Sequence, residues 1–237
     1  MPKLKIALII TLLALNFASL KYNFLNVAHP HAFNVLRGLS STTLVIGRIV
    51  KSRVDGIFSA GGFVGRFRVP KKYEKIPGPK YQYMLFNGEA GIPQKPKFQA
   101  YRSQTGGQGI FFSFFDWVLS GSLSPQNRLM VFNSFSVALL AILISFIVVW
   151  IFNSWGYIAG IFAQLSILLS PQLIIFGDNI WWQPWSYFFP FVLLLLNSKR
   201  YFMAAFFGFS VKFFFTGYEY ITTAFIILYN TPQKLGS

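Results

Sequence analysis

Long apolar runs separated by short polar turns fill the second half of the chain, and one further run opens it. The first lies within residues 1–21, and the others cover residues 129–152, 157–176, 186–196, 201–216 and 221–229. Runs of this kind predict bilayer-crossing helices, because a helix satisfies its own backbone hydrogen bonds where water is absent. The pattern therefore predicts an all-α protein, a polytopic transmembrane helix bundle of about five or six membrane segments.

The opening run is short for a membrane span. Residues 6–20 would extend about 22 Å as a helix, against a hydrocarbon core of about 30 Å. A cleaved signal peptide is one interpretation. An uncleaved signal anchor is the other, and we favour it because the residues around Ala18 match a cleavage site poorly.

Residues 22–128 contain no apolar run of spanning length and are interrupted by Pro and Gly, which predicts a long extracytoplasmic loop. Within it, residues 33–53 place Val45, Ile46 and Ile49 on one side of a helix. This spacing predicts an amphipathic helix lying in the membrane interface. Residues 110–119 are aromatic and apolar, and we expect them to lie along the membrane as well.

Two breaks divide the apolar half of the chain. Residues 153–156 predict a tight turn between the first two spans of this half. Pro171 predicts a kink near the end of the next span rather than its end, because neighbouring groups can satisfy the freed carbonyl. The last apolar segment is short, so we expect the bundle, residues 129–237, to be incomplete at its C-terminus.

The composition supports a membrane protein. Hydrophobic residues make up 54% and charged residues 11% of the chain, whereas a soluble domain has about 25% charged residues. High aromatic content and low charge also argue against disorder. The absence of Cys excludes disulfide scaffolds, zinc–cysteine sites and thiol nucleophiles.

The net charge of +15 suggests three classes of partner: nucleic acid, an anionic bilayer surface or a phosphorylated substrate. We expect no nucleic-acid partner, because the chain contains no such binding motif and is mostly compatible with lipid. The positive-inside rule places Lys3, Lys5, Lys199 and Arg200 in the cytoplasm. If each predicted segment then crosses the membrane once in turn, three regions lie on the outer face: residues 22–128, the loop after residue 176 and the end of the segment 201–216.

Only six residues are acidic, and three of them have plain interpretations. Glu74 lies among lysines as a solvated partner, Glu89 lies in a turn, and Asp116 either caps a helix or faces water. Glu219 interrupts an apolar stretch, where a carboxylate is either functional, paired with Lys212 or exposed at a helix end.

Asp178 and Asp55 each have a functional and a plain interpretation. Asp178 precedes Asn179 and three tryptophans, so it is either a ligand for Mg2+ or Mn2+ or part of an interfacial aromatic belt. Asp55 precedes Gly56 and is either a turn residue or a general base just outside the membrane.

The chain resembles the GT-C class of membrane glycosyltransferases in three features: an opening transmembrane helix, a long outer loop with an early aspartate, and a polytopic bundle. The segments around Ser170-Pro171 to Trp185 and 217–223 are similar to those of bacterial polytopic proteins associated with that class. The resemblance implies that Asp55 is the catalytic base and that Asp178 binds a divalent metal or the donor phosphate. Members of the class usually continue for many more helices than this chain contains.

The activity implied is transfer of a sugar from a polyprenyl-phosphate carrier to a glycan or protein acceptor, at the outer face of the cytoplasmic (inner) membrane. The expected substrate-binding residues are Arg53, Arg66 and Arg68 for the phosphate, with Trp181, Trp182, Tyr218 and Glu219 for the sugar or prenyl chain. Two alternatives remain: a non-catalytic envelope scaffold that docks on anionic lipid, and a transporter fragment that uses Lys212 and Glu219.

Overall fold

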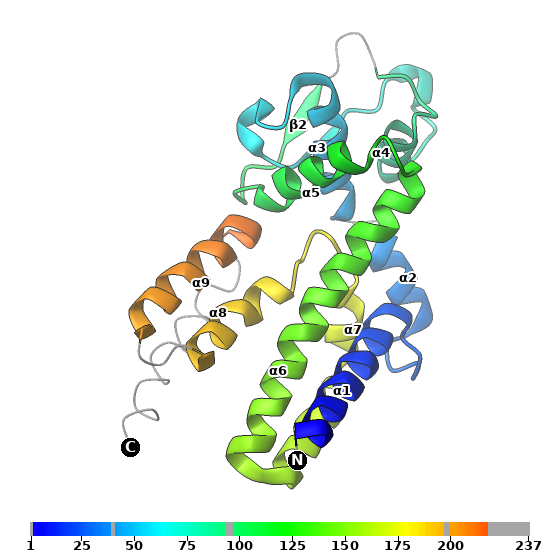
Figure 1. Ribbon diagram of the computed structural model, residues 1–237. Helices are drawn as coiled ribbons and strands as arrows, with labels where there is room; N and C mark the ends of the chain where they lie inside the picture. The colour runs from blue at the N-terminus through cyan, green and yellow to red at the C-terminus, as the bar shows by residue number, and fades with distance from the viewer. Residues whose placement is uncertain (1, 39–40, 93–96, 197–199, 218–237) are drawn as a thin grey trace.

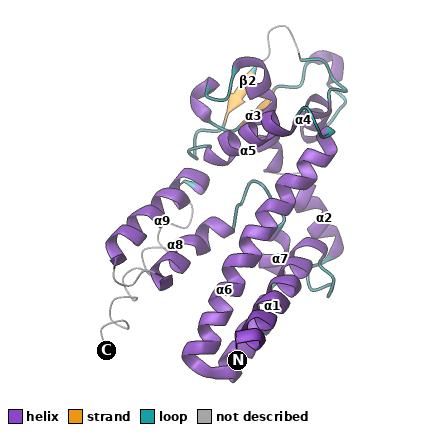
Figure 2. Cartoon of the chain, in the orientation of Figure 1, coloured by secondary structure: helices purple, strands orange, loops and turns teal. Residues whose placement is uncertain are grey.

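The computed structural model describes residues 2–38, 41–92, 97–196 and 200–217. These residues are predominantly helical, which confirms the predicted helical class, and they form two parts (Figures 1 and 2). The head comprises the described residues of 41–124, and the stem comprises residues 2–22 and the described residues of 125–217. The segment 23–38 runs between them.

The head is built around one hydrophobic core, to which the stem contributes Phe132 and Trp181. Its elements are α3 (Thr42–Asp55), η1 (Ser59–Gly62), β1 (Gly65–Phe67), η2 (Lys71–Tyr73), α4 (Gly78–Asn87), β2 (Phe98–Ala100) and α5 (Gly107–Leu119). The two strands pair antiparallel, with Arg66 opposite Gln99. The sequence did not predict this sheet, because strands of three residues leave no alternation to detect.

The predicted interfacial helix is wrong in two respects. Residues 33–53 divide between α2 (Pro30–Gly38) and α3. The apolar face of α3 is also not available to lipid, since Val45, Ile46 and Ile49 are fully buried against α4, α5 and β1. Gly47 allows this packing, because a Cβ there would lie 2.2 Å from the carbonyl oxygen of Gly65.

The stem contains the long apolar helices. Its elements are α1 (Pro2–Tyr22), α6 (Pro125–Leu168), α7 (Pro171–Gly177), α8 (Trp185–Leu196) and α9 (Tyr201–Thr216). The chain reverses direction within α6 at Gly156, where φ is 86°, so the reversal falls inside the predicted turn (Figure 1). The predicted kink at Pro171 is instead a break: α6 ends at Leu168, and α7 begins at Pro171 with Ser170 as its N-cap. The predicted segment 221–229 lies outside the described residues.

Polar side chains join the stem helices at mid-length. Asn16 of α1 donates a hydrogen bond to Ser145 (2.8 Å) and accepts one from Gln164 (2.8 Å), which lie on the two arms of α6. All three residues are buried. Polar contacts of this kind hold helices together where the surroundings give no hydrophobic driving force.

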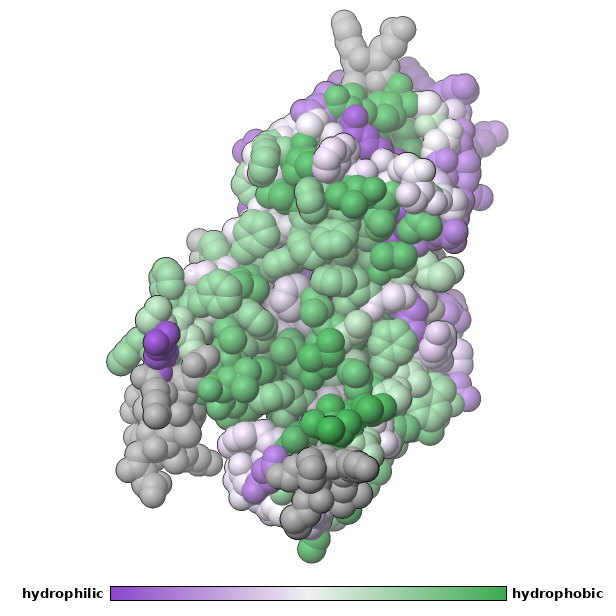
Figure 3. All heavy atoms as spheres, viewed as in Figure 1, coloured by the Kyte–Doolittle hydropathy of each residue, from purple (hydrophilic) through white to green (hydrophobic). Residues whose placement is uncertain are grey.

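One helix of the described residues, α6, is long and apolar enough to cross a membrane by length and composition. Residues Ile6–Tyr22, Trp185–Leu196 and Tyr201–Thr216 form shorter apolar helices. Hydrophobic residues cover most of the stem surface in Figure 3, and hydrophilic residues gather on the head.

Hydrogen bonds and aromatic contacts fix the head to the stem. Thr105 donates to the carbonyl oxygens of Phe213 and Phe214 at the end of α9, at 2.9 and 2.7 Å. Trp181, in the loop between α7 and α8, inserts into the core of the head and meets the ring of Tyr101 edge to face at 5.5 Å. The head therefore lies at the end of the stem where α1 and α7 finish and α6 begins (Figure 1).

Candidate functional site

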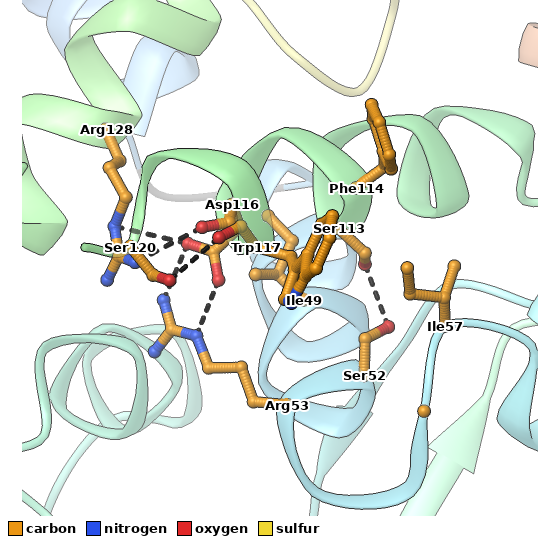
Figure 4. Close-up of a pocket in the computed structure, with 11 residues that line it drawn as sticks. Ile49, Ser52, Arg53, Ile57, Ser113, Phe114, Asp116, Trp117, Ser120 and Arg128 are labelled. Atoms are coloured by element: carbon orange, nitrogen blue, oxygen red, sulfur yellow. Dashed lines mark hydrogen bonds and ion pairs between the residues drawn. The ribbon is translucent and has the colours of Figure 1, made fainter. Parts of the chain in front are cut away.

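A pocket of about 690 Å3 opens where α3, α5 and the first turn of α6 meet (Figure 4). Its position follows from the spacing of residues on α3. Ile49, Ser52, Arg53 and Gly56 recur every three or four residues, so they share one side of the helix and its end. The facing wall comes from α5 and from Arg128, which immediately precedes the long apolar run of α6. The pocket therefore lies level with the start of the apolar stem.

Asp116 is the centre of this pocket. Its carboxylate is 2% exposed and receives a bidentate pair of hydrogen bonds from Arg53, at 2.7 Å from Nε and 2.9 Å from Nη2. Arg128 lies on the other side, with its Nε 3.3 Å from Oδ1 of Asp116. This second contact is electrostatic, because the Nε of Arg128 makes no hydrogen bond. Two guanidinium groups around one carboxylate leave the cluster with one net positive charge.

The arginine side chains are held in place by the head. Arg53 donates from Nη1 to the carbonyl oxygen of Phe86 (2.7 Å), and its guanidinium lies 4.5 Å from the centre of the Phe86 ring. The guanidinium of Arg128 lies 5.9 Å from the same ring. These contacts fix both groups before any ligand arrives, which lowers the entropy lost when an anion binds.

The remaining lining divides into hydroxyl groups and an aromatic rim. Ser52 donates to Ser113 at 2.8 Å, and Ser120 also lines the pocket (Figure 4). Phe114 and Trp117 border the opening and are 48% and 68% exposed. A polar interior with an apolar rim suits an amphipathic ligand whose charged group enters first.

Arg48 shapes the loop that closes one side of this pocket. Its fully buried guanidinium donates to the carbonyl oxygens of Ile57 and Ser59, just beyond α3. Burial lowers the pKa of this guanidinium from its usual value. Ile57 lines the pocket, so Arg48 acts as a positioning residue for its wall.

The residues predicted to bind the phosphate do not come together. Arg53 lies in the pocket, whereas Arg66 lies on β1 and Arg68 follows that strand as an exposed residue. Asp55, the predicted base, is the last residue of α3 and forms an ion pair with Lys51 one turn earlier. Both Lys51 and Asp55 lie on a different side of α3 from Arg53, so Asp55 does not line this pocket.

The structure places Asp178 in a setting that does not fit a divalent metal. The carboxylate is fully buried, and the ammonium group of Lys21 lies 3.2 and 3.4 Å from its two oxygens. A metal ion would have to displace this cation from the carboxylate. Among the residues that the structure describes, no three His, Asp or Glu side chains gather closely enough to share a metal ion.

The aromatic candidates have separate positions. Trp181 is buried in the core of the head and Trp182 packs against that core, so Trp181 is a structural contact rather than part of an exposed belt. Asn179 caps this loop by accepting from the backbone N–H groups of Trp181 and Trp182. Tyr218 and Glu219 lie outside the described residues.

Sequence reasoning missed the two residues that complete the pocket. We expected Asp116 to cap a helix or face water, but it lies inside α5 and is buried by Arg53 and Arg128. The sequence did contain one indication. Asp116 is a lone carboxylate in an aromatic helix, and a carboxylate that becomes buried on such a helix requires a cation beside it. Its partners could not be identified, since 63 residues separate Arg53 from Asp116.

Comparison of the chain with protein-family models, curated proteins and solved structures returned no match. The interpretation of the pocket therefore depends on its own geometry and chemistry.

Proposed function

We propose that this chain is a multi-pass protein of the cytoplasmic membrane that acts as a GT-C-like glycosyltransferase, with a polyprenyl-phosphate-linked sugar as donor. The pocket around Asp116 holds the donor phosphate beside Arg53 and Arg128. The prenyl chain leaves over Phe114 and Trp117 toward the bilayer.

One observation carries this proposal: the pocket combines a net positive interior with an exposed aromatic rim where the apolar stem begins. Guanidinium groups bind phosphate through paired, charge-assisted hydrogen bonds. Aromatic side chains favour the boundary between hydrocarbon and water. In a lipid phosphate the charged group adjoins an apolar chain. The phosphate would therefore lie in the positive interior of the pocket and the chain against its aromatic rim.

The multi-pass arrangement is supported by the direction of the stem helices. α1, the two arms of α6, α8 and α9 alternate in direction along the stem (Figure 1). The outer surfaces of α6 and α9 expose large apolar side chains, among them Phe162, Phe202 and Phe206. Exposed residues of this kind fit contact with lipid rather than water.

Sugar transfer in this pocket also requires a general base. As the acceptor hydroxyl oxygen bonds to the anomeric carbon, the bond from that carbon to the phosphate oxygen breaks, and polyprenyl phosphate leaves with the electron pair. The hydroxyl proton moves to a base within hydrogen-bond reach of that oxygen. Asp55 does not meet this requirement, because it pairs with Lys51 on the side of α3 away from the donor pocket, so the base is not assigned to Asp55.

Binding of farnesyl phosphate to the full chain in phosphatidylcholine nanodiscs tests the donor pocket. The wild-type protein should bind farnesyl phosphate and not farnesol. Arg53→Gln should weaken binding about tenfold or more, or about 1.4 kcal/mol. Trp117→Ala should weaken it severalfold without loss of folding, because this side chain is largely exposed.

Arg68→Gln is the matched control, because it removes the same charge from an exposed position outside the pocket. Equal binding of farnesyl phosphate by the wild type and by the Arg53 and Trp117 variants would contradict the proposal. Binding that follows net charge alone, with Arg68→Gln as damaging as Arg53→Gln, would favour a scaffold that docks on anionic lipid.

A further inference from the structure

A second hollow lies on the head, away from the donor pocket. Its volume is about 1090 Å3, and it opens among α3, the η1 segment and the strand β2. In Figure 1 the strand β2 lies above α3 and α5, toward the end of the head that is farther from the stem. The hollow therefore faces a different environment from the donor pocket, whose wall includes the start of α6.

Three cations line this hollow: Lys51 of α3, Lys97 immediately before β2 and Arg102 shortly after it. Lys97 and Arg102 are exposed. No carboxylate is among the described residues that line it. The neighbouring Asp55 balances Lys51, so the hollow keeps about two positive charges to attract a ligand.

The backbone fixes the spacing of these cations. The N–H of Arg68 donates to the carbonyl oxygen of Lys97 (2.9 Å), and the N–H of Tyr101 donates to the carbonyl oxygen of Val64 (2.7 Å). These bonds hold both ends of β2 against β1. Lys51 extends over the ring of Phe98 at 5.8 Å from its centre, so it approaches the same strand. The backbone positions that carry the charges are therefore held close together, which favours a ligand with two anionic groups.

We propose that this hollow binds a ligand that carries at least two negative charges as phosphate groups. This inference stands on the three cations that line the hollow and does not depend on the proposed glycosyl transfer. The ligand is a soluble or glycan-borne phosphate and not a headgroup of the surrounding bilayer.

Titration calorimetry with inorganic pyrophosphate tests this inference on the full chain in phosphatidylcholine nanodiscs. The double variant Lys97→Gln, Arg102→Gln should lose pyrophosphate affinity about tenfold or more. Its melting temperature should be unchanged, because both side chains are exposed. The matched control, Lys75→Gln with Lys80→Gln, removes two charges from exposed positions outside the hollow and should bind pyrophosphate like the wild type.

Two outcomes would overturn the inference. One is wild-type protein that does not bind pyrophosphate, and the other is a control variant that loses as much affinity as the hollow variant. If the hollow instead binds a bilayer headgroup, pyrophosphate binding should be lost when phosphatidylglycerol replaces phosphatidylcholine in the nanodisc. Farnesyl phosphate binding should be unchanged in the hollow variant, so failure of the hollow and failure of the donor pocket are separate results.

Discussion

Replacing Asp116 with asparagine tests the charge cluster at the centre of the donor pocket. The substitution keeps the shape of the side chain and removes its negative charge. Arg53 is 29% exposed and can turn toward water, so loss of this partner costs little. The side chain of Arg128 is only 7% exposed and lies beside the covered carboxylate, so it would remain as a buried and unbalanced cation.

The magnitude follows from this difference in burial. Removing one partner of a buried ion pair costs about 3–5 kcal/mol, because the other charge stays desolvated. The amide oxygen of the introduced asparagine would still accept a hydrogen bond. We therefore expect Asp116→Asn to lower the free energy of unfolding by about 3 kcal/mol, at the lower end of that range. Adding Arg128→Gln should recover part of this loss, with a coupling energy of about 2 kcal/mol.

Unfolding of the full chain in mixed micelles, followed by tryptophan fluorescence, measures these free energies. The variants required are Asp116→Asn, Arg128→Gln, Arg53→Gln and the double variants that combine Asp116→Asn with each arginine change. Coupling should be larger with Arg128 than with Arg53, because Arg53 has access to water. The reasoning is refuted if Asp116→Asn costs less than about 1 kcal/mol or if its coupling with Arg53 is the larger one.

Two other predictions use different parts of the molecule. Asn16→Ala should destabilise the stem by about 0.6–2 kcal/mol in the same unfolding assay, because it removes the bonds to Ser145 and Gln164, and Leu15→Ala on the exposed side serves as its control. Burial raises the pKa of Tyr83 to about 12, so the unfolding free energy should fall as pH rises from about 10 to 12. Tyr83→Phe should reduce that loss, and part of it should remain because burial also raises the pKa of Tyr81.

The apolar segments of the stem could be predicted because each is a local property of the sequence. The predicted segments 186–196 and 201–216 correspond to α8 and α9, and the turn at 153–156 contains the reversal at Gly156. The break at Pro171 was misjudged because a proline kink and a helix N-terminus share the same local signal. The structure resolves it through Ser170, which caps the new helix.

The head could not be predicted in the same way. Its helices are short, and its core forms only when α3, α4 and α5 meet, so residues 22–128 resembled a loop with separate surface helices. The charge pairs depend on contacts across long stretches of chain. Lys21 and Asp178, which form a buried pair, are 157 residues apart. The sequence therefore identified Asp178 as unusual but could not show that a lysine already balances it.

The central claim is that the head and the turn at Gly156 lie on opposite sides of one membrane, with the donor pocket between head and stem. The chain contains no Cys, so single cysteines at Lys75 in the head and at the exposed Trp155 beside the turn report on this directly. In oriented membrane vesicles, a maleimide that cannot cross lipid should label position 75 only from the outer side and position 155 only from the cytoplasmic side. Labelling of both positions from the same side would contradict the account.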